Sequence, residues 1–334
     1  DLLAFDLKHR NELQDYFRTY YQNDNIHVIT SATHTHYANS VRDQNYVDYL
    51  CALLKKECAD LTHRQIDDVK FSYQHMHSTA IGKSRISGYE TGKEELCLIR
   101  FYEKEKNFFT IVYYNCHPTI LKAETPYFSS EYPGYVLKRL EEEYPQCDFS
   151  FLQGAAGDIS SRFTRDGQDY DALIRLSEKL LQDLSLMMKK ETEKFIFNPA
   201  YKEEVIRFEH EFTPIDLSLI RNDLSPREME TIRLGQIERT KLENKSSEIF
   251  SSPIEEAIIS CLDLNGIKVI FFPNEIFSAY MEHIDLNKQM LVSYSNGYGA
   301  YVLPIGFQYI TYEMFTDTLT NQAKEKIIET IQNI

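Results

Sequence analysis

The stretch Ile26-His27-Val28-Ile29-Thr30-Ser31-Ala32-Thr33-His34-Thr35-His36 begins with an apolar run and ends on two histidines. The run at residues 26–32 predicts a buried β-strand. Side chains two residues apart lie on the same face of a strand, so His34 and His36 would look into one cleft. Open α/β sheets keep their ligand sites at strand ends. We therefore predict a two-histidine site at a sheet edge; the alternative is a hydrogen-bonded histidine pair in a loop.

Outward from this stretch, helical and strand patterns alternate first, and paired strands follow. We predict helices at residues 7–21, 41–61, 133–143, 170–190 and 315–331, and strands at 69–77, 96–102, 108–114, 147–152, 257–264, 267–272 and 291–295. Asn265-Gly266 is a strong hairpin signal between two of these strands. The order predicts one α/β domain over residues 1–334, a mixed β-sheet layered with helices, with a charged helical insertion at about 215–248.

Composition excludes several classes of function. A net charge of −15 disfavours nucleic acid and anionic membrane surfaces. No stretch approaches the ~18 apolar residues of a transmembrane segment. The six scattered cysteines form no Cys-x-x-Cys pair, so we expect free thiols and a reducing, cytoplasmic compartment. The chain begins at Asp1 and not at methionine, so an N-terminal truncation belongs to this expectation and leaves the question of a signal peptide open.

Four further segments place polar side chains beside apolar runs. They are Tyr113-Tyr114-Asn115-Cys116-His117-Pro118-Thr119, Gln153-Gly154-Ala155-Ala156-Gly157-Asp158-Ile159-Ser160, Phe271-Phe272-Pro273-Asn274-Glu275 and Ser295-Asn296-Gly297-Tyr298-Gly299-Ala300-Tyr301-Val302. A carboxylate directly after a buried strand, as at Glu275, is costly unless it meets a cation. The small-residue loop before Ser160 lets the backbone approach a substrate closely. A second His-x-His, at His75 and His77, has no partner motif, and we interpret it as strand packing.

Taken in order, these pieces resemble the motifs of the neutral, non-lysosomal ceramidase family. The matching stretches are Ala32 through His36, Asn115 through Thr119, Gln153 through Ser160, Pro273-Asn274-Glu275, and Asn296 through Tyr301 followed by Tyr312-Glu313. They run from about residue 26 to 313, so the resemblance covers most of the chain. It implies the fold of the ceramidase catalytic domain and a zinc-dependent hydrolase that cleaves an N-acyl amide bond in a sphingolipid-like substrate.

The resemblance also implies roles for individual residues. Zinc would be held by His34, His117, Glu275 and Tyr301. Four further residues would serve catalysis, namely Ser160, His36, Arg85 and Tyr312. His36 would act as a hydrogen-bond donor or proton shuttle, and Arg85 would polarise the amide carbonyl. Whether Ser160 attacks the carbonyl or positions the attacking water stays open. Ser161 stands where the family usually has proline, so either hydroxyl could act.

Departures from the family pattern bear on the substrate. Tyr37-Ala38-Asn39 follows the first dyad, Asn274 precedes Glu275, and the family's opening strands and C-terminal immunoglobulin-like domain are absent. Residues 218–245 lack an exposed apolar stripe for docking on a membrane. We therefore expect an N-acyl substrate that is smaller or more polar than ceramide, bound in a shallow cleft lined by tyrosines and polar groups. The alternatives are a metal-binding family member without turnover that acts as a binding module, and a metal-dependent esterase or phosphatase.

Overall fold

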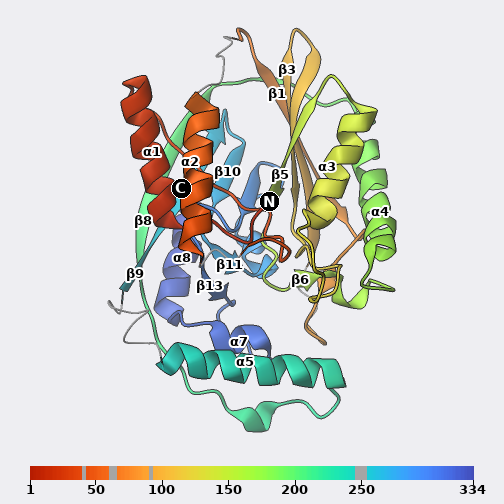
Figure 1. Ribbon diagram of the computed structural model, residues 1–334, viewed down its shortest axis with the longest axis vertical. Coiled ribbons are helices and arrows are strands. Elements are labelled where there is room, and N and C mark those ends of the chain that lie inside the picture. The colour runs from red at the N-terminus through yellow and green to blue at the C-terminus, as the bar shows by residue number, and fades with distance from the viewer. Residues whose placement is uncertain (40–42, 60–65, 90–92, 245–253) are drawn as a thin grey trace.

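Two β-sheets lie face to face in the centre of the molecule, with helices outside them (Figure 1). The computed structural model describes residues 1–39, 43–59, 66–89, 93–244 and 254–334. The first sheet has the order β5-β4-β3-β1-β7, formed by Asp148–Gln153, Lys106–Tyr114, Glu94–Glu103, Lys70–Ser78 and Phe195–Ile196. The second has the order β12-β10-β9-β8, formed by Gln289–Val292, Lys268–Phe271, Ile254–Leu264 and Pro199–Glu209. The predicted α/β class with mixed sheets is confirmed, because each sheet holds both parallel and antiparallel pairs.

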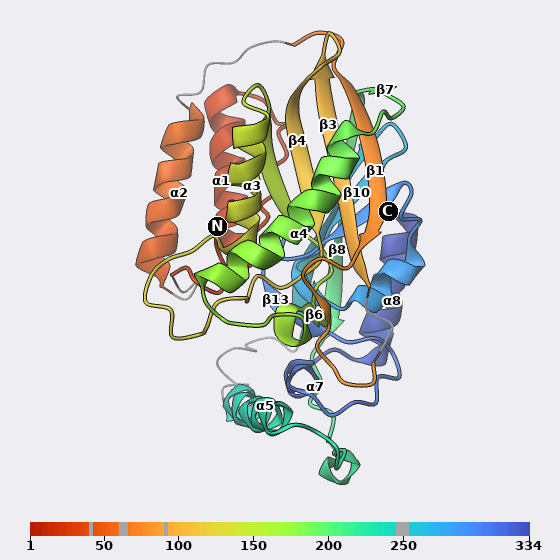
Figure 2. The same cartoon turned by 90° about the vertical axis from the view of Figure 1, so that its right-hand side faces the viewer.

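The helices cover the outer faces of the two sheets. They are α1 (Leu7–Tyr21), α2 (Gln44–Ala59), α3 (Glu131–Glu143), α4 (Tyr170–Lys189), α5 (Pro226–Asn244), α7 (Tyr312–Thr316) and α8 (Asn321–Asn333), with 3-10 turns η1 (Ser161–Phe163), η2 (Leu217–Leu219) and η3 (Ser278–His283). α3 and α4 lie on the first sheet, and α8 lies on the second (Figure 2). No helix of the described residues is long and apolar enough to cross a membrane.

The core follows from the strand and helix patterns. Phe71, Ile99 and Phe101 of the first sheet pack against Val269 and Phe271 of the second. On the other face of the first sheet, α4 buries leucines at helical spacing. Such burial is worth about 1.5–3 kcal/mol for each large apolar side chain before the entropy cost is subtracted. All six cysteines are free, as predicted, and five of them are buried.

Residues 26–32 do not form the strand that their apolar pattern predicts. The ladder is reduced to a single bridge between Ser31 and Ser295. The backbone instead bonds to a loop, because the Ala32 amide donates to the Tyr294 carbonyl and the Asn296 side chain accepts from the Thr30 amide. The expected alternation across a strand was therefore the wrong reason for pairing the two histidines that follow.

The predicted helix at 315–331 is also wrong as one element, because the chain turns between α7 and α8. Thr320 caps α8 by accepting from the Ala323 amide, and the buried Asp317 pairs with Lys324 at 2.5 Å. Two short segments complete the framework near the site: β2 (Lys83–Ser84) pairs with β6 (Ile159–Ser160), and β11 (Asn274–Ile276) runs parallel to β13 (Gly299–Val302).

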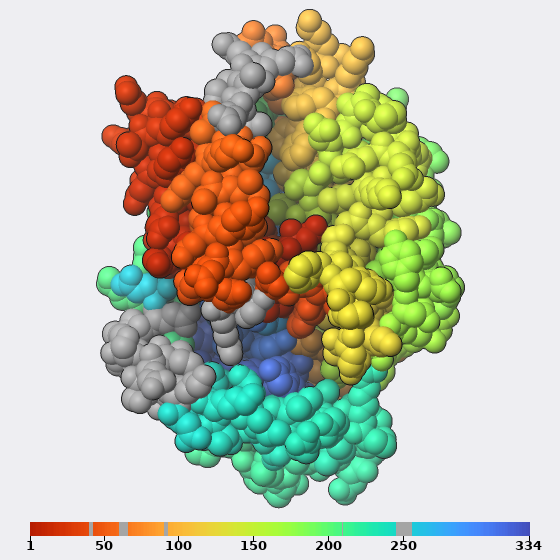
Figure 3. Space-filling model, viewed as in Figure 1, coloured from red at the N-terminus to blue at the C-terminus, as the bar shows by residue number. Residues whose placement is uncertain are grey.

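α5 lies within the region predicted to be a charged insertion, whose end at 245–248 is outside the described residues. It packs on α7, with Gly235 against the Phe315 ring and the Tyr312 backbone. On the face shown in Figure 3, α5 lies below a hollow in which N-terminal and C-terminal residues are both visible. The insertion thus lies beside the segments that carry the sequence motifs.

A buried acid makes stability depend on pH. Glu94 accepts hydrogen bonds from the Tyr114 hydroxyl and the Gly82 amide, and burial raises its pKa from 4.5 to about 7. Between these values the folded state holds a proton that the unfolded chain has lost, so unfolding becomes easier as pH rises. We expect Glu94→Gln to remove part of this slope, up to a few kcal/mol, in urea unfolding across pH 4.5–7. The exposed Glu141→Gln should leave the slope unchanged; equal slopes in both variants would contradict the assignment.

Candidate metal centre

Three segments that are distant in sequence bring two histidines and a glutamate together. His34 lies in a loop with φ of 61°, His117 follows β4, and Glu275 is the central residue of β11. Oε2 of Glu275 lies 3.5 Å from Nε2 of His34 and 3.2 Å from Nε2 of His117. All three side chains are buried. The predicted convergence of these residues is therefore found in the structure.

Backbone carbonyls determine which ring nitrogens carry hydrogen. Nδ1 of His34 lies 2.7 Å from the Leu3 carbonyl oxygen, and Nδ1 of His117 lies 2.6 Å from that of Ala156. A carbonyl oxygen only accepts, so each Nδ1 must donate. Burial and the Arg85 guanidinium lower the pKa of His117 to about 4, so its ring is neutral at pH 7. A neutral imidazole with hydrogen on Nδ1 presents a lone pair at Nε2.

The arrangement leaves acceptors facing one another. Burial opposes ionisation of Glu275, yet the adjacent His34 and His117 hold its pKa well below the usual range, so the group is a carboxylate. Nε2 of His34 has no hydrogen-bond partner among the described residues. Lone pairs that converge on a buried carboxylate repel one another unless a cation lies between them. Two imidazole nitrogens and a carboxylate oxygen therefore fit a bound metal cation.

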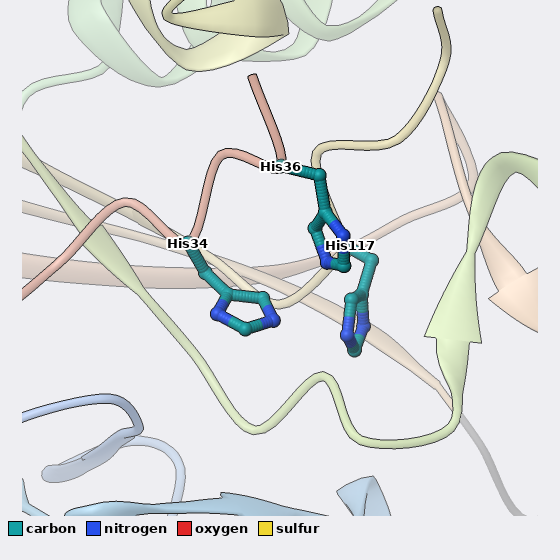
Figure 4. Close-up of side chains that lie close together, drawn as sticks. All are labelled: His34, His36 and His117. Atoms are coloured by element: carbon teal, nitrogen blue, oxygen red, sulfur yellow. The ribbon is translucent and has the colours of Figure 1, made fainter. Parts of the chain in front are cut away.

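His36 brings a third imidazole to the same space (Figure 4). Its ring centroid is 5.0 Å from that of His34 and 5.9 Å from that of His117. The ligand atoms of the three histidines all lie within 4.8 Å of one another. The His36 side chain is exposed, but surrounding protein and the other two imidazoles lower its pKa well below the usual value. His36 is thus a neutral base with access to solvent.

Tyrosines line the other side of the cluster. Tyr301 is the register partner of Glu275 in the β11–β13 pair, and its hydroxyl accepts a 2.9 Å hydrogen bond from Arg85. Burial raises the pKa of Tyr301 well above its usual range, which Arg85 opposes. Two residues that we did not single out contact the predicted ligands. Tyr298 donates to Oε1 of Glu275 at 2.6 Å, and Tyr294 stacks on His34 with centroids 3.7 Å apart. Their signal was the tyrosine-rich sequence after residue 293.

Arg85 is held in place by a buried ion pair. Its Nη2 lies 2.8 Å from the Glu313 carboxylate and donates to the Gly157 carbonyl at 2.7 Å, while Nε has no partner among the described residues. Glu313 had only the adjacent Tyr312 as a sequence signal. The Tyr312 ring lies 6.2 Å from that of Tyr301, farther from the histidines than the other predicted residues.

Breaking this ion pair should destabilise the protein. We expect Glu313→Leu to cost about 3–5 kcal/mol of unfolding free energy, because it leaves the Arg85 charge buried and unpaired. The double variant Arg85→Met with Glu313→Leu should recover much of that loss, since neither charge then remains. Urea unfolding of the two singles and the double measures the coupling. Additive losses would show that the two side chains do not act as a pair.

Ser160 and Ser161 occupy different environments at the end of β6. Ser160 forms a bridge with His117 in the backbone ladder, and its Oγ accepts from the Arg162 amide at 3.3 Å. Oγ of Ser161 is buried without a hydrogen-bond partner among the described residues. No contact with His36 is given for either hydroxyl in the described part of the chain, so the catalytic role of Ser160 stays a prediction.

A cavity of about 250 Å³ adjoins the arginine side of the centre. Arg85, Arg162 and Arg221 contribute its cationic wall, and Leu219 and Ile232 contribute apolar surface. Burial and the nearby Arg85 lower the pKa of Arg162 to about 10, so it remains charged at pH 7. Arg162 makes no ion pair with a described residue. The wall is therefore mixed and contains more arginine than the tyrosine-lined cleft that we predicted.

The fold is found among solved structures, although sequence comparison alone finds nothing. No protein-family model matches the chain, and no curated protein matches it. The neutral ceramidase from Pseudomonas aeruginosa has a TM-score of 0.73 at 12% identity, over 99% of this chain and 64% of that one. A ceramidase complexed with C2 has a TM-score of 0.72 at 11% identity, over 99% of this chain and 65% of that one. The chain thus has a ceramidase-like α/β fold and spans less than two thirds of those proteins.

Proposed function

We propose that the protein is a zinc-dependent hydrolase that cleaves an N-acyl amide bond. The observation that carries this proposal is the convergence of two unprotonated imidazole nitrogens and a carboxylate on one buried point. His34, His117 and Glu275 would hold Zn²⁺, a donor set that suits this cation. Tyr301 would complete the set as a phenolate, which the Arg85 hydrogen bond favours. The likeness to ceramidase structures supports the same reading.

Bound zinc supplies Lewis acidity toward an amide carbonyl and lowers the pKa of water. The residues of this chain would do the rest. Arg85 holds a buried, unpaired Nε–H that can donate to the carbonyl oxygen as negative charge develops there. His36, neutral and open to solvent, can take a proton from the attacking group and pass it to the leaving amine. Ser160 would attack the carbonyl or orient the attacking water.

The cavity beside Arg85 supports a substrate that is smaller or more polar than ceramide. Its volume of about 250 Å³ is below the ~300–1,000 Å³ of typical ligand pockets. Arg162 offers a charged donor group that no described carboxylate occupies, and Tyr312 lies on the same wall. A long acyl chain alone would leave these groups without partners. We therefore expect a short N-acyl amide whose amine side carries hydrogen-bond acceptors.

Metal analysis combined with a substrate panel tests the proposal. The full chain would be stripped with a chelator, reloaded with Zn²⁺ and assayed on N-acyl amides that vary in chain length and head group. We expect zinc-dependent hydrolysis, fastest for short, polar amides. Matched esters and phosphate esters in the same assay identify an esterase or a phosphatase. Zinc binding without hydrolysis of any substrate would favour a binding module instead.

A further inference from the structure

A second group of metal-ligand side chains lies on β1 and β3, away from the candidate metal centre. His75 and His77 lie on one face of β1, and Glu95 of β3 is the register partner of His77. Nε2 of His75 is 2.5 Å from Oε2 of Glu95, and Nδ1 of His77 is 2.8 Å from the same oxygen. The earlier interpretation of this histidine pair as strand packing is therefore incomplete, because the fold supplies a carboxylate.

Burial and charge make Glu95 an unusual partner for two imidazoles. Its side chain is 2% exposed, and no lysine or arginine of the described chain lies within ion-pair distance of it. A buried carboxylate is costly unless a cation compensates it. The adjoining cavity, about 250 Å³ in volume, is lined by Glu282 and Asp285 as well as Glu95, with Lys93 as its only described cationic side chain besides histidine. The charge of this pocket is thus predominantly negative.

We propose that His75, His77 and Glu95 bind a divalent transition-metal cation of the Zn²⁺ or Co²⁺ type. Two imidazoles and one carboxylate are the ligands that such borderline cations prefer. Ligand atoms bound at about 2.0–2.2 Å around a tetrahedral cation are ~3.3 Å apart, so the imidazoles need to move outward by less than ~1 Å. The exposed side of His77 leaves room for that movement, and water in the cavity can complete the coordination.

Such a cation would hold β1 and β3 together at the end of the first sheet. It would also bear on the candidate metal centre through one residue. The Glu95 amide donates to Oδ1 of Asn115 at 2.6 Å, and Asn115 lies two residues before His117 and donates to the Ala155 carbonyl. We therefore expect a structural cation whose loss loosens this sheet edge. The inference does not depend on the proposed hydrolase activity.

Metal stoichiometry tests the second site. The full chain, stripped with a chelator, would be dialysed against micromolar Co²⁺ and its metal content measured. We expect two equivalents for the wild type, and one for His77→Ala and for Glu95→Gln, with affinity at this site reduced at least about ten-fold. His27→Ala, which removes an exposed histidine outside both groups, is the matched control and should keep two. His77 is largely exposed, so its variant decides the matter if Glu95→Gln does not fold.

The variant His34→Ala separates this site from the candidate centre. It should keep one equivalent, and Co²⁺ should still raise its melting temperature; His34→Ala combined with His77→Ala should show neither effect. Two equivalents in His77→Ala, or none in His34→Ala, would overturn the second site. One equivalent that is lost in His77→Ala but kept in His34→Ala would instead overturn the proposed zinc centre and leave the second site standing.

Discussion

Replacing Glu275 with glutamine should remove the metal from the candidate centre and reduce amide hydrolysis by about a thousand-fold or more. The carboxylate is the only described anionic group that faces the Nε2 atoms of His34 and His117. Glutamine keeps its size and loses its charge. A loss of about 4 kcal/mol of transition-state stabilisation corresponds to that factor, and metal catalysis supplies several kcal/mol. Metal content and kcat/KM with a short N-acyl amide measure the two effects.

The same variant has a distinctive effect on the metal-free protein. Without a cation, the Glu275 carboxylate faces two imidazole lone pairs, whereas an amide at this position can donate to one of them. We expect the metal-free Glu275→Gln protein to be at least as stable toward urea as the metal-free wild type. Glu193→Gln, on the exposed surface, is the control for both experiments. Undiminished metal content and activity in Glu275→Gln would end the zinc hypothesis.

Replacing Ser160 with alanine should leave the metal in place and reduce turnover by about 10²–10⁴-fold, the range for a lost proton-transfer or nucleophilic group. Ser160 bridges to His117 in the backbone ladder, so its hydroxyl lies beside the centre without being one of the proposed ligands. Metal analysis and kcat of the same preparation check both statements. A pre-steady-state burst in the wild type would assign Ser160 as the nucleophile, and its absence would favour a water-positioning role.

Ser161 provides the matched control for this experiment. Its Oγ is buried without a hydrogen-bond partner in the described part of the chain, so removing it exposes no new polar group. We expect Ser161→Ala to keep both stability and turnover within a few-fold of the wild type. If Ser161→Ala loses activity while Ser160→Ala retains it, the catalytic role moves by one residue.

Local patterns determined most of the secondary structure. The periodicity at 170–190 and the continuous apolar run at 96–102 give α4 and β3 with shifts of one or two residues at their ends. Both elements are long, and each has one strongly preferred way to bury its apolar side chains. The positions of His34, His117 and Glu275 beside apolar runs were likewise sufficient to predict that they converge. Their chemistry is expensive to bury singly, which makes such residues conspicuous in a sequence.

Only the tertiary structure decided how these residues face one another. Residues 26–32 read as a strand, but Tyr294 and Asn296 bind their backbone in a loop. The hydrogen on each imidazole is placed by the carbonyls of Leu3 and Ala156, which sequence distance does not connect to them. Glu95, which turns a packing histidine pair into a metal-ligand group, becomes a partner only through the β1–β3 register. A local pattern reports which side chains need burial, whereas hydrogen-bond direction and carboxylate placement depend on contacts between segments that are distant in the chain.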